Sequence, residues 1–108
     1  MLDRESLQEI VKNNPKELLD LFIQDSPQLV QALGMAVASG DRLELRSAAH
    51  ALKGAVSNFG ARHSQALAAE LEKVARTGDL EDAQHLVDAL TLEVDRLRSQ
   101  LVEIAQLV

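Results

Sequence analysis

His50 stands beside a lysine and a glycine at spacings that suit the binding of an anion. The segment 49–61 reads AHALKGAVSNFGA, and its apolar residues recur every three or four positions, which predicts a helix. At about 100° per residue, His50, Lys53, Gly54 and Ser57 lie roughly 80° to 180° away from the apolar seam. These four residues are therefore expected on one outward-facing strip, called the His50 strip below.

Gly54 is unusual because a glycine inside an exposed helix costs about 1 kcal/mol relative to alanine. Helical side chains lean toward the N-terminus, so a side chain at position 54 would overhang His50. Its absence leaves space beside the imidazole, and Lys53 leans the same way with its ammonium. This combination suits a phosphoryl group on a ring nitrogen. Gly34 also lies inside a predicted helix, has no histidine nearby, and is interpreted as a close packing contact.

Five helices are predicted to position the His50 strip, because the spacing of three and four recurs along the whole chain. No stretch alternates with period two, so no strand is expected. The short loops indicate antiparallel neighbours. The predicted fold is all-α, an antiparallel up-down four-helix bundle with a short additional N-terminal helix, in one domain over residues 1–108. The expected helices cover residues 3–13, 15–39, 42–59, 62–77 and 80–106.

Glycines and capping residues mark the ends of these helices. The expected boundaries are Asn14-Pro15, Gly40-Asp41 and Gly78-Asp79, with Gly60 as a further glycine that ends a helix. The expected apolar seams include Leu45, Ala49, Leu52, Val56 and Phe59 in the third helix, Leu18, Phe22, Leu29, Leu33 and Val37 in the second, Leu67, Leu71 and Val74 in the fourth, and Leu80 through Val108 in the last.

Two further signals concern the second and third helices. Asp41 with Glu44 fits a variant of the capping box at the start of the third helix. Pro27 is expected to kink or split the second helix, with Asp25 or Ser26 capping the second half, because proline lacks an N–H to donate.

Composition excludes several classes of protein. The chain has 108 residues, a net charge of −6, only 2% aromatic residues and no cysteine. The missing cysteines exclude disulfides, cysteine-based zinc sites and thiol catalysis. Acidity and scarce aromatics argue against a nucleic-acid partner. No apolar run approaches the ~20 residues that span a bilayer, so we expect no membrane partner and a cytoplasmic protein. A buried seam on every long helix favours a monomer.

The chain resembles the histidine-containing phosphotransfer (HPt) domain. That family's signature, H-x-L-K-G followed by small residues and a second glycine, is matched by His50, Leu52, Lys53, Gly54, Gly60 and Ala61. The resemblance spans essentially the whole chain. It implies a four-helix bundle whose histidine accepts and donates a phosphoryl group in a multistep His–Asp relay.

The resemblance also implies roles for residues and partners. His50 is the expected phospho-acceptor, Lys53 the cation on the phosphate side, and Gly54 the residue that provides clearance. The implied partners are response-regulator receiver domains and a hybrid sensor histidine kinase. The receiver would supply the aspartate and Mg²⁺, so we expect no cofactor or metal on this chain and no autokinase activity.

Glu72 is a candidate partner for the imidazole. The third and fourth helices form a hairpin that turns near Ala61, so position 50 should face position 72. Glu72 could accept a hydrogen bond from Nδ1–H of His50 and leave the Nε2 lone pair free to attack. The alternative is that Glu72 pairs with Arg76 at i+4. Arg76 would add positive potential, and Ala51 and Ser57 would border the docking surface.

Three other functions compete with the relay. A helical adaptor that has lost relay activity would show the same apolar spacing, although the intact His50 strip disfavours it. The phospho-acceptor part of a histidine kinase typically has an acidic residue after its histidine, whereas Ala51 follows here. A metal site through His50, His63 and His85 is disfavoured because they lie 13 and 22 residues apart, with no i, i+4 pair.

Overall fold

The computed structural model describes residues 3–107 and is built from helices, with no strand among those residues. The expected order and number of long helices are confirmed, and their ends fall within a few residues of the predicted ones. The last helix is preceded by one turn of 3₁₀ helix. The elements are α1 (Arg4–Lys12), α2 (Lys16–Ser39), α3 (Arg42–Ser57), α4 (Arg62–Thr77), η1 (Leu80–Asp82) and α5 (Ala83–Gln106).

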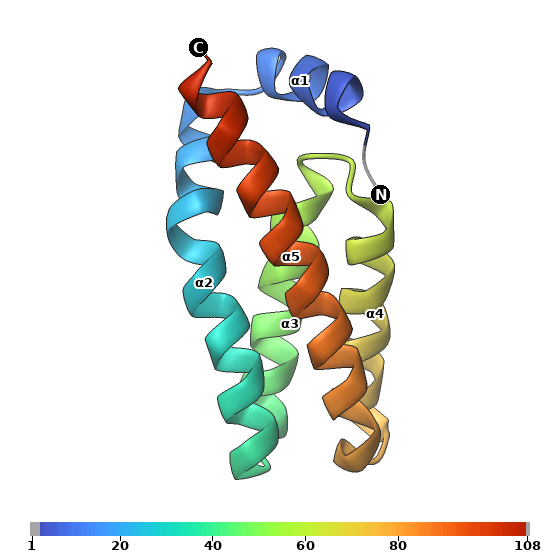
Figure 1. Cartoon of the computed structure of the whole chain (residues 1–108). Helices are drawn as coiled ribbons and strands as arrows, with labels where there is room; N and C mark the ends of the chain where they lie inside the picture. The colour runs from blue at the N-terminus through green and yellow to red at the C-terminus, as the bar shows by residue number, and fades with distance from the viewer. Residues whose placement is uncertain (1–2, 108) are drawn as a thin grey trace.

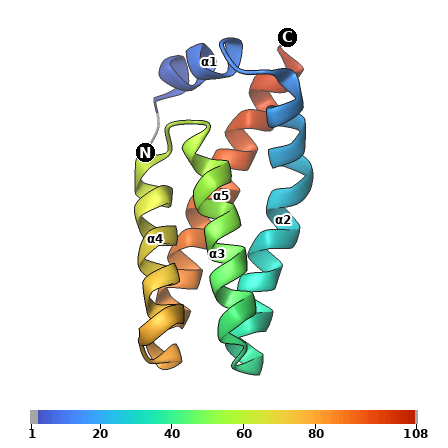
Figure 2. The ribbon, with the colours of Figure 1, turned by 180° about the vertical axis from the view of Figure 1, so that it is seen from behind.

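The four long helices run up and down along an elongated bundle of 43 × 21 × 18 Å (Figure 1). Each packs on two neighbours, in the cyclic order α2, α3, α4 and α5. The short helix α1 lies across one end of the bundle. Figure 2 shows the opposite face, where α3 and α4 run side by side. None of the helices described is long and apolar enough to span a bilayer.

The core is aliphatic apart from two phenylalanines. Phe22 and Phe59 pack edge to face with ring centroids 5.3 Å apart. The predicted seam of α3 and its end is buried throughout, which leaves the remaining faces of that helix for solvent. The seam of α5 is also buried from Ala83 to Ile104, although Leu80 is only partly buried. Val108 lies outside the described residues.

The predicted seams of α2 and α4 are partly wrong. Leu18, Leu29 and Val37 of α2 and Leu67 and Val74 of α4 are only partly buried. Alanine and serine hold several of the buried positions on these two helices, whereas the spacing of the large apolar residues alone guided the prediction. The fully buried positions that the spacing missed are Leu19, Ser26, Ala36, Ser64, Ala68 and Ala75.

Two glycines end helices by the same hydrogen-bond pattern. Gly40 has φ 72° and Gly60 has φ 67°, in the left-handed region that glycine adopts without strain. In each case the next residue donates its N–H to a carbonyl five residues back, from Asp41 to Ala36 and from Ala61 to Val56. This is the Schellman motif, and it confirms both glycines as helix ends.

The N-cap predictions are confirmed at Asp41 and wrong at Asn14. The Asp41 carboxylate accepts from the Glu44 N–H at 3.0 Å. Asn14 does not cap α2; its Nδ2 donates to the Ile10 carbonyl at 2.7 Å and to the Asn58 carbonyl at 3.5 Å. The amide therefore ties the end of α1 to the α3–α4 connection.

Pro27 does not split α2, which is continuous from Lys16 to Ser39, so neither Asp25 nor Ser26 caps a second segment. Proline cannot donate to the carbonyl four residues back, that of Ile23. Arg98 of α5 donates its Nε–H to the Ile23 carbonyl instead, at 3.0 Å. A side chain from a neighbouring helix thus satisfies the acceptor that Pro27 leaves open.

Candidate functional site

His50 lies in the middle of α3 and projects from the bundle. Its side chain is 72% exposed. Gly54 and Ser57 are exposed as well, and Lys53 is half-buried toward α4. The outward orientation of the His50 strip is therefore as the helical spacing predicts, and another protein can reach the imidazole.

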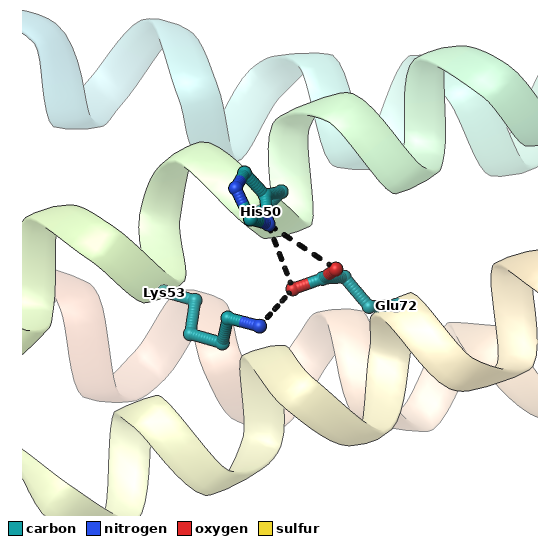
Figure 3. Close-up of polar contacts among 3 residues, drawn as sticks. All are labelled: His50, Lys53 and Glu72. Atoms are coloured by element: carbon teal, nitrogen blue, oxygen red, sulfur yellow. Dashed lines mark hydrogen bonds and ion pairs between the residues drawn. The ribbon is translucent and has the colours of Figure 1, made fainter.

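Glu72 of α4 faces His50, as the hairpin register predicts (Figure 3). His50 Nδ1 lies 3.3 Å from each carboxylate oxygen of Glu72. These distances exceed the usual 2.9–3.0 Å of an N–H···O bond, so the contact is shared between two oxygens and weak in the free protein. With the Nδ1–H tautomer directed at the carboxylate, the Nε2 lone pair is available to react.

Lys53 also binds Glu72. Its Nζ lies 2.7 Å from Glu72 Oε1, and Figure 3 shows the carboxylate between the ammonium and the imidazole. The alternative in which Glu72 pairs with Arg76 is wrong, because the carboxylate is occupied by residues of α3. The sequence placed Lys53 near the phosphate side of His50 but gave no sign of this ion pair.

The Lys53 ammonium is the main cause of a lowered pKa at Glu72, and the contact with His50 acts in the same direction. The Glu72 side chain is only 18% exposed, and this burial raises its pKa, but the two lowering contacts outweigh that effect. The carboxylate is therefore ionised at neutral pH and can accept a hydrogen bond from Nδ1–H.

Gly54 makes no close packing contact with the described part of the chain. A Cβ built at this position would meet nothing within 4 Å, so the bundle itself would accept alanine. The open space above His50 is consistent with the clearance predicted for it. Gly34 gives the same result, and its interpretation as a close packing contact is wrong, because none of the described atoms comes within 4 Å of a Cβ built there.

A groove beside His50 runs between α2 and α3 and encloses about 270 Å³. Ala51 and Ala55 line its α3 side and Leu21, which is 51% exposed, lines its α2 side. Ser26 also lines the groove, and its buried Oγ has no hydrogen-bond partner within residues 3–107. Ala51 was expected to border the docking surface; the contribution of α2 was missed, since Leu21 lies off the predicted seam.

Leu43 is a second exposed apolar residue near His50 that was not predicted as part of the site. It lies seven residues before His50, two helical turns along the same face, and is 76% exposed. The sequence does indicate this position, because Leu43 is in phase with His50 and therefore lies outside the buried seam of α3.

Basic residues lie near His50 on the side of α4, away from the α2–α3 groove. Arg46 lies one turn before His50 on α3, and Arg76 lies one turn beyond Glu72 on α4; both are exposed. These two arginines place positive charge beside the His50–Glu72 pair, although the chain as a whole carries −6.

Ser57 donates its Oγ–H to the Gly54 carbonyl at 2.6 Å, so its hydroxyl is engaged within α3.

No group of three His, Cys, Asp or Glu side chains within residues 3–107 is arranged to hold a metal ion. His50, His63 and His85 therefore form no shared site.

The model of the Hpt domain family matches residues 17–100, which include the His50 strip and Glu72. This chain belongs to the Hpt domain family. Among solved structures, it is similar to the histidine-containing phosphotransfer protein B (HptB) of Pseudomonas aeruginosa PAO1. The identity is 34% and the TM-score 0.82, over 97% of this chain and 91% of that one. A comparison with curated proteins found no match. The helical bundle described above is the Hpt fold. The chain is a histidine-containing phosphotransfer protein of phosphorelay signalling.

Proposed function

We propose that His50 Nε2 accepts a phosphoryl group from the aspartyl phosphate of a receiver domain and returns it to the aspartate of another receiver. The observation that carries this proposal is an imidazole 72% exposed whose Nδ1 faces an ionised carboxylate. The Nε2 lone pair attacks phosphorus, an N–P bond forms, and the O–P bond breaks as the aspartate carboxylate leaves. The reverse step regenerates neutral His50.

Glu72 acts as a positioning residue in this step. It holds the proton on Nδ1 and orients the ring, and the positive charge that develops on the imidazole during attack lies next to its carboxylate. Lys53 is the cation nearest to this pair and would balance the added phosphoryl charge, as its place in the family motif suggests.

The α2–α3 groove, Leu43 and the basic flank together suit a receiver domain as docking partner. The groove supplies apolar contacts on one side of His50, and Leu43 supplies another two turns along the same face. Arg46 and Arg76 supply positive charge. That charge favours a partner whose phosphorylation site is acidic and steers its approach. The resulting interface would be small and transient, as repeated exchange of a phosphoryl group requires.

The receiver would supply the aspartate and Mg²⁺, and this chain would act as a monomeric phosphocarrier without autokinase activity. A hybrid sensor histidine kinase is the proposed origin of the phosphoryl group. Family membership is the ground for these proposals and for placing the exchange in the cytoplasm.

The test is transfer in both directions. The chain is incubated with a panel of radiolabelled phospho-receiver domains, purified from them, and then offered to unlabelled receivers. The proposal predicts label on the chain and its passage to a second receiver. Incubation with ATP and Mg²⁺ alone should give no label; label in that control would favour a kinase component. Failure of every receiver to label the chain would favour the adaptor.

A further inference from the structure

A second groove, called the end groove below, lies where α1, the start of α2 and the end of α5 meet, at the end of the bundle that α1 covers (Figure 1). It encloses about 570 Å³, roughly twice the volume of the α2–α3 groove and within the range of small-molecule sites. Aliphatic side chains form most of its wall: Val11, Leu19, Ile104, Ala105 and Leu107.

The end groove lies largely outside the part of the chain that matches the family model. The match covers residues 17–100, whereas Val11, Ile104 and Leu107 lie before or after that range. Leu107 is 68% exposed at the edge of the groove. Phosphotransfer at His50 uses none of these residues, so the relay does not explain the open apolar surface.

Two lysines give the end groove a positive charge. Lys12 and Lys16 line it together with Gln8 and Asn14, and none of the described residues that line it is acidic. Neither lysine takes part in an ion pair within residues 3–107. The chain as a whole carries a net charge of −6, whereas the charged side chains among the described residues of this groove are both basic.

Helix stability accounts for Lys12 but not for Lys16. Lys12 lies in the last turn of α1, where a cation is favourable. Lys16 is the first residue of α2, where the positive end of the helix dipole disfavours a cation, and Pro15 supplies no side-chain acceptor there. Glu17 follows in the first turn but does not line the groove. The start of α2 therefore presents positive charge to the groove.

We propose that the end groove binds an amphipathic carboxylate. The aliphatic chain of the ligand lies along Val11, Leu19 and Ile104, and its carboxylate pairs with Lys12 and Lys16. In this arrangement the aliphatic chain of the ligand contacts the apolar wall of the groove, and its carboxylate lies next to the oppositely charged ammonium groups.

The test uses decanoate, below its micellar concentration, added to the isotope-labelled full chain and followed through its backbone amide NMR signals. We expect saturable shifts at Val11, Leu19, Ile104 and Ala105. Decanoate should bind roughly fifteenfold more tightly than octanoate, since each of its two additional methylenes contributes about a factor of four when buried. Acetate, which has the charge without the chain, should leave these signals unchanged.

Charge is tested with a ligand and with variants. Decyltrimethylammonium has the same chain length and the opposite charge, and it should bind at least tenfold more weakly. The double variant Lys12→Glu, Lys16→Glu should weaken decanoate binding at least tenfold, while Lys73→Glu, an exposed lysine of α4 outside the groove, should not. Ala105→Leu should fill the groove and block binding while thermal unfolding remains unchanged or moves upward.

Four results would overturn the proposal. These are equal binding of decanoate and decyltrimethylammonium, no saturation, shifts that map to another face, and an acidic leucine-containing peptide that shifts the groove signals when decanoate does not. The last result would assign the groove to a protein partner. All these measurements use the unphosphorylated chain and are independent of relay activity.

Discussion

Glu72 Oε1 lies 2.7 Å from Lys53 Nζ, and the same carboxylate lies 3.3 Å from His50 Nδ1. One carboxylate on α4 therefore contacts two residues of the family motif on α3. The ion pair keeps Glu72 ionised, and the ionised carboxylate is the acceptor that favours the Nδ1–H tautomer of His50. In the free protein Lys53 is thus bound to Glu72 rather than lying free in solvent.

Replacing Glu72 should alter the tautomer of His50 before it alters the fold. In Glu72→Ala the acceptor is lost, so the Nδ1–H tautomer should become less populated and transfer from a phospho-receiver should slow by about tenfold or more. Imidazole ¹⁵N chemical shifts measure the tautomer, and single-turnover transfer measures the rate. Glu72→Gln keeps an oxygen acceptor and should recover part of both. A Glu72→Ala protein with slower transfer but an unchanged tautomer would contradict the positioning role.

The Lys53–Glu72 pair should make stability depend on acid pH. The pKa of Glu72 is lowered from its ordinary value of 4.5 in the folded chain, so the unfolded chain binds more protons between the two values. The contribution of the pair is complete above pH 4.5 and is lost as the pH falls through the lowered pKa. Urea unfolding of the parent and Glu72→Gln should differ by up to about 1 kcal/mol at pH 7. The difference should shrink below pH 4.5, and a difference independent of pH would contradict the assignment.

Gly54 and Gly34 form a matched pair for testing clearance. Both lie inside helices, and a Cβ at either position meets nothing within 4 Å. Alanine at either position should therefore stabilise the bundle by about 1 kcal/mol, measured by thermal unfolding.

A larger side chain should separate the two positions. Gly54→Leu should block phosphotransfer because its side chain overhangs His50, while Gly34→Leu should transfer normally. Gly34 lies on α2 and is not among the residues that line the α2–α3 groove beside His50. Equal transfer by both leucine variants would refute the clearance argument.

The bond from Arg98 to the Ile23 carbonyl predicts a coupling between Arg98 and Pro27. Arg98→Met should destabilise the bundle by about 1.5 kcal/mol or more, because a carbonyl within α2 loses its charged donor. In a Pro27→Ala background, the restored N–H can donate to the same carbonyl, so the loss should fall by half or more.

Urea unfolding of the four proteins gives this double-mutant cycle. Arg96→Met is the control, since Arg96 makes only a 3.5 Å pair with Glu93 at the surface and should change stability by no more than about 0.5 kcal/mol. Additive effects of Arg98→Met and Pro27→Ala would contradict the coupling.

Periodic spacing and glycine positions predicted the parts of the fold that depend on nearby residues. The outward His50 strip and the helix ends at Gly40 and Gly60 follow from local geometry, and the short α3–α4 turn fixes the register of His50 with Glu72. The continuity of α2 through Pro27 could not be predicted, because its donor, Arg98, lies far along the chain. The partner of Lys53 was also missed, since a long flexible side chain selects its acceptor only after the helices have packed.

The most direct measurement is phosphoryl transfer from one phospho-receiver to the parent chain and to His50→Gln. The exposed position of His50 means that the substitution should leave helicity and thermal unfolding unchanged. The account predicts label on the parent that is lost in acid and retained in base, as a phosphoramidate requires, and no label on His50→Gln. Label of the same stability on a folded His50→Gln protein would place the acceptor at another residue and contradict the account.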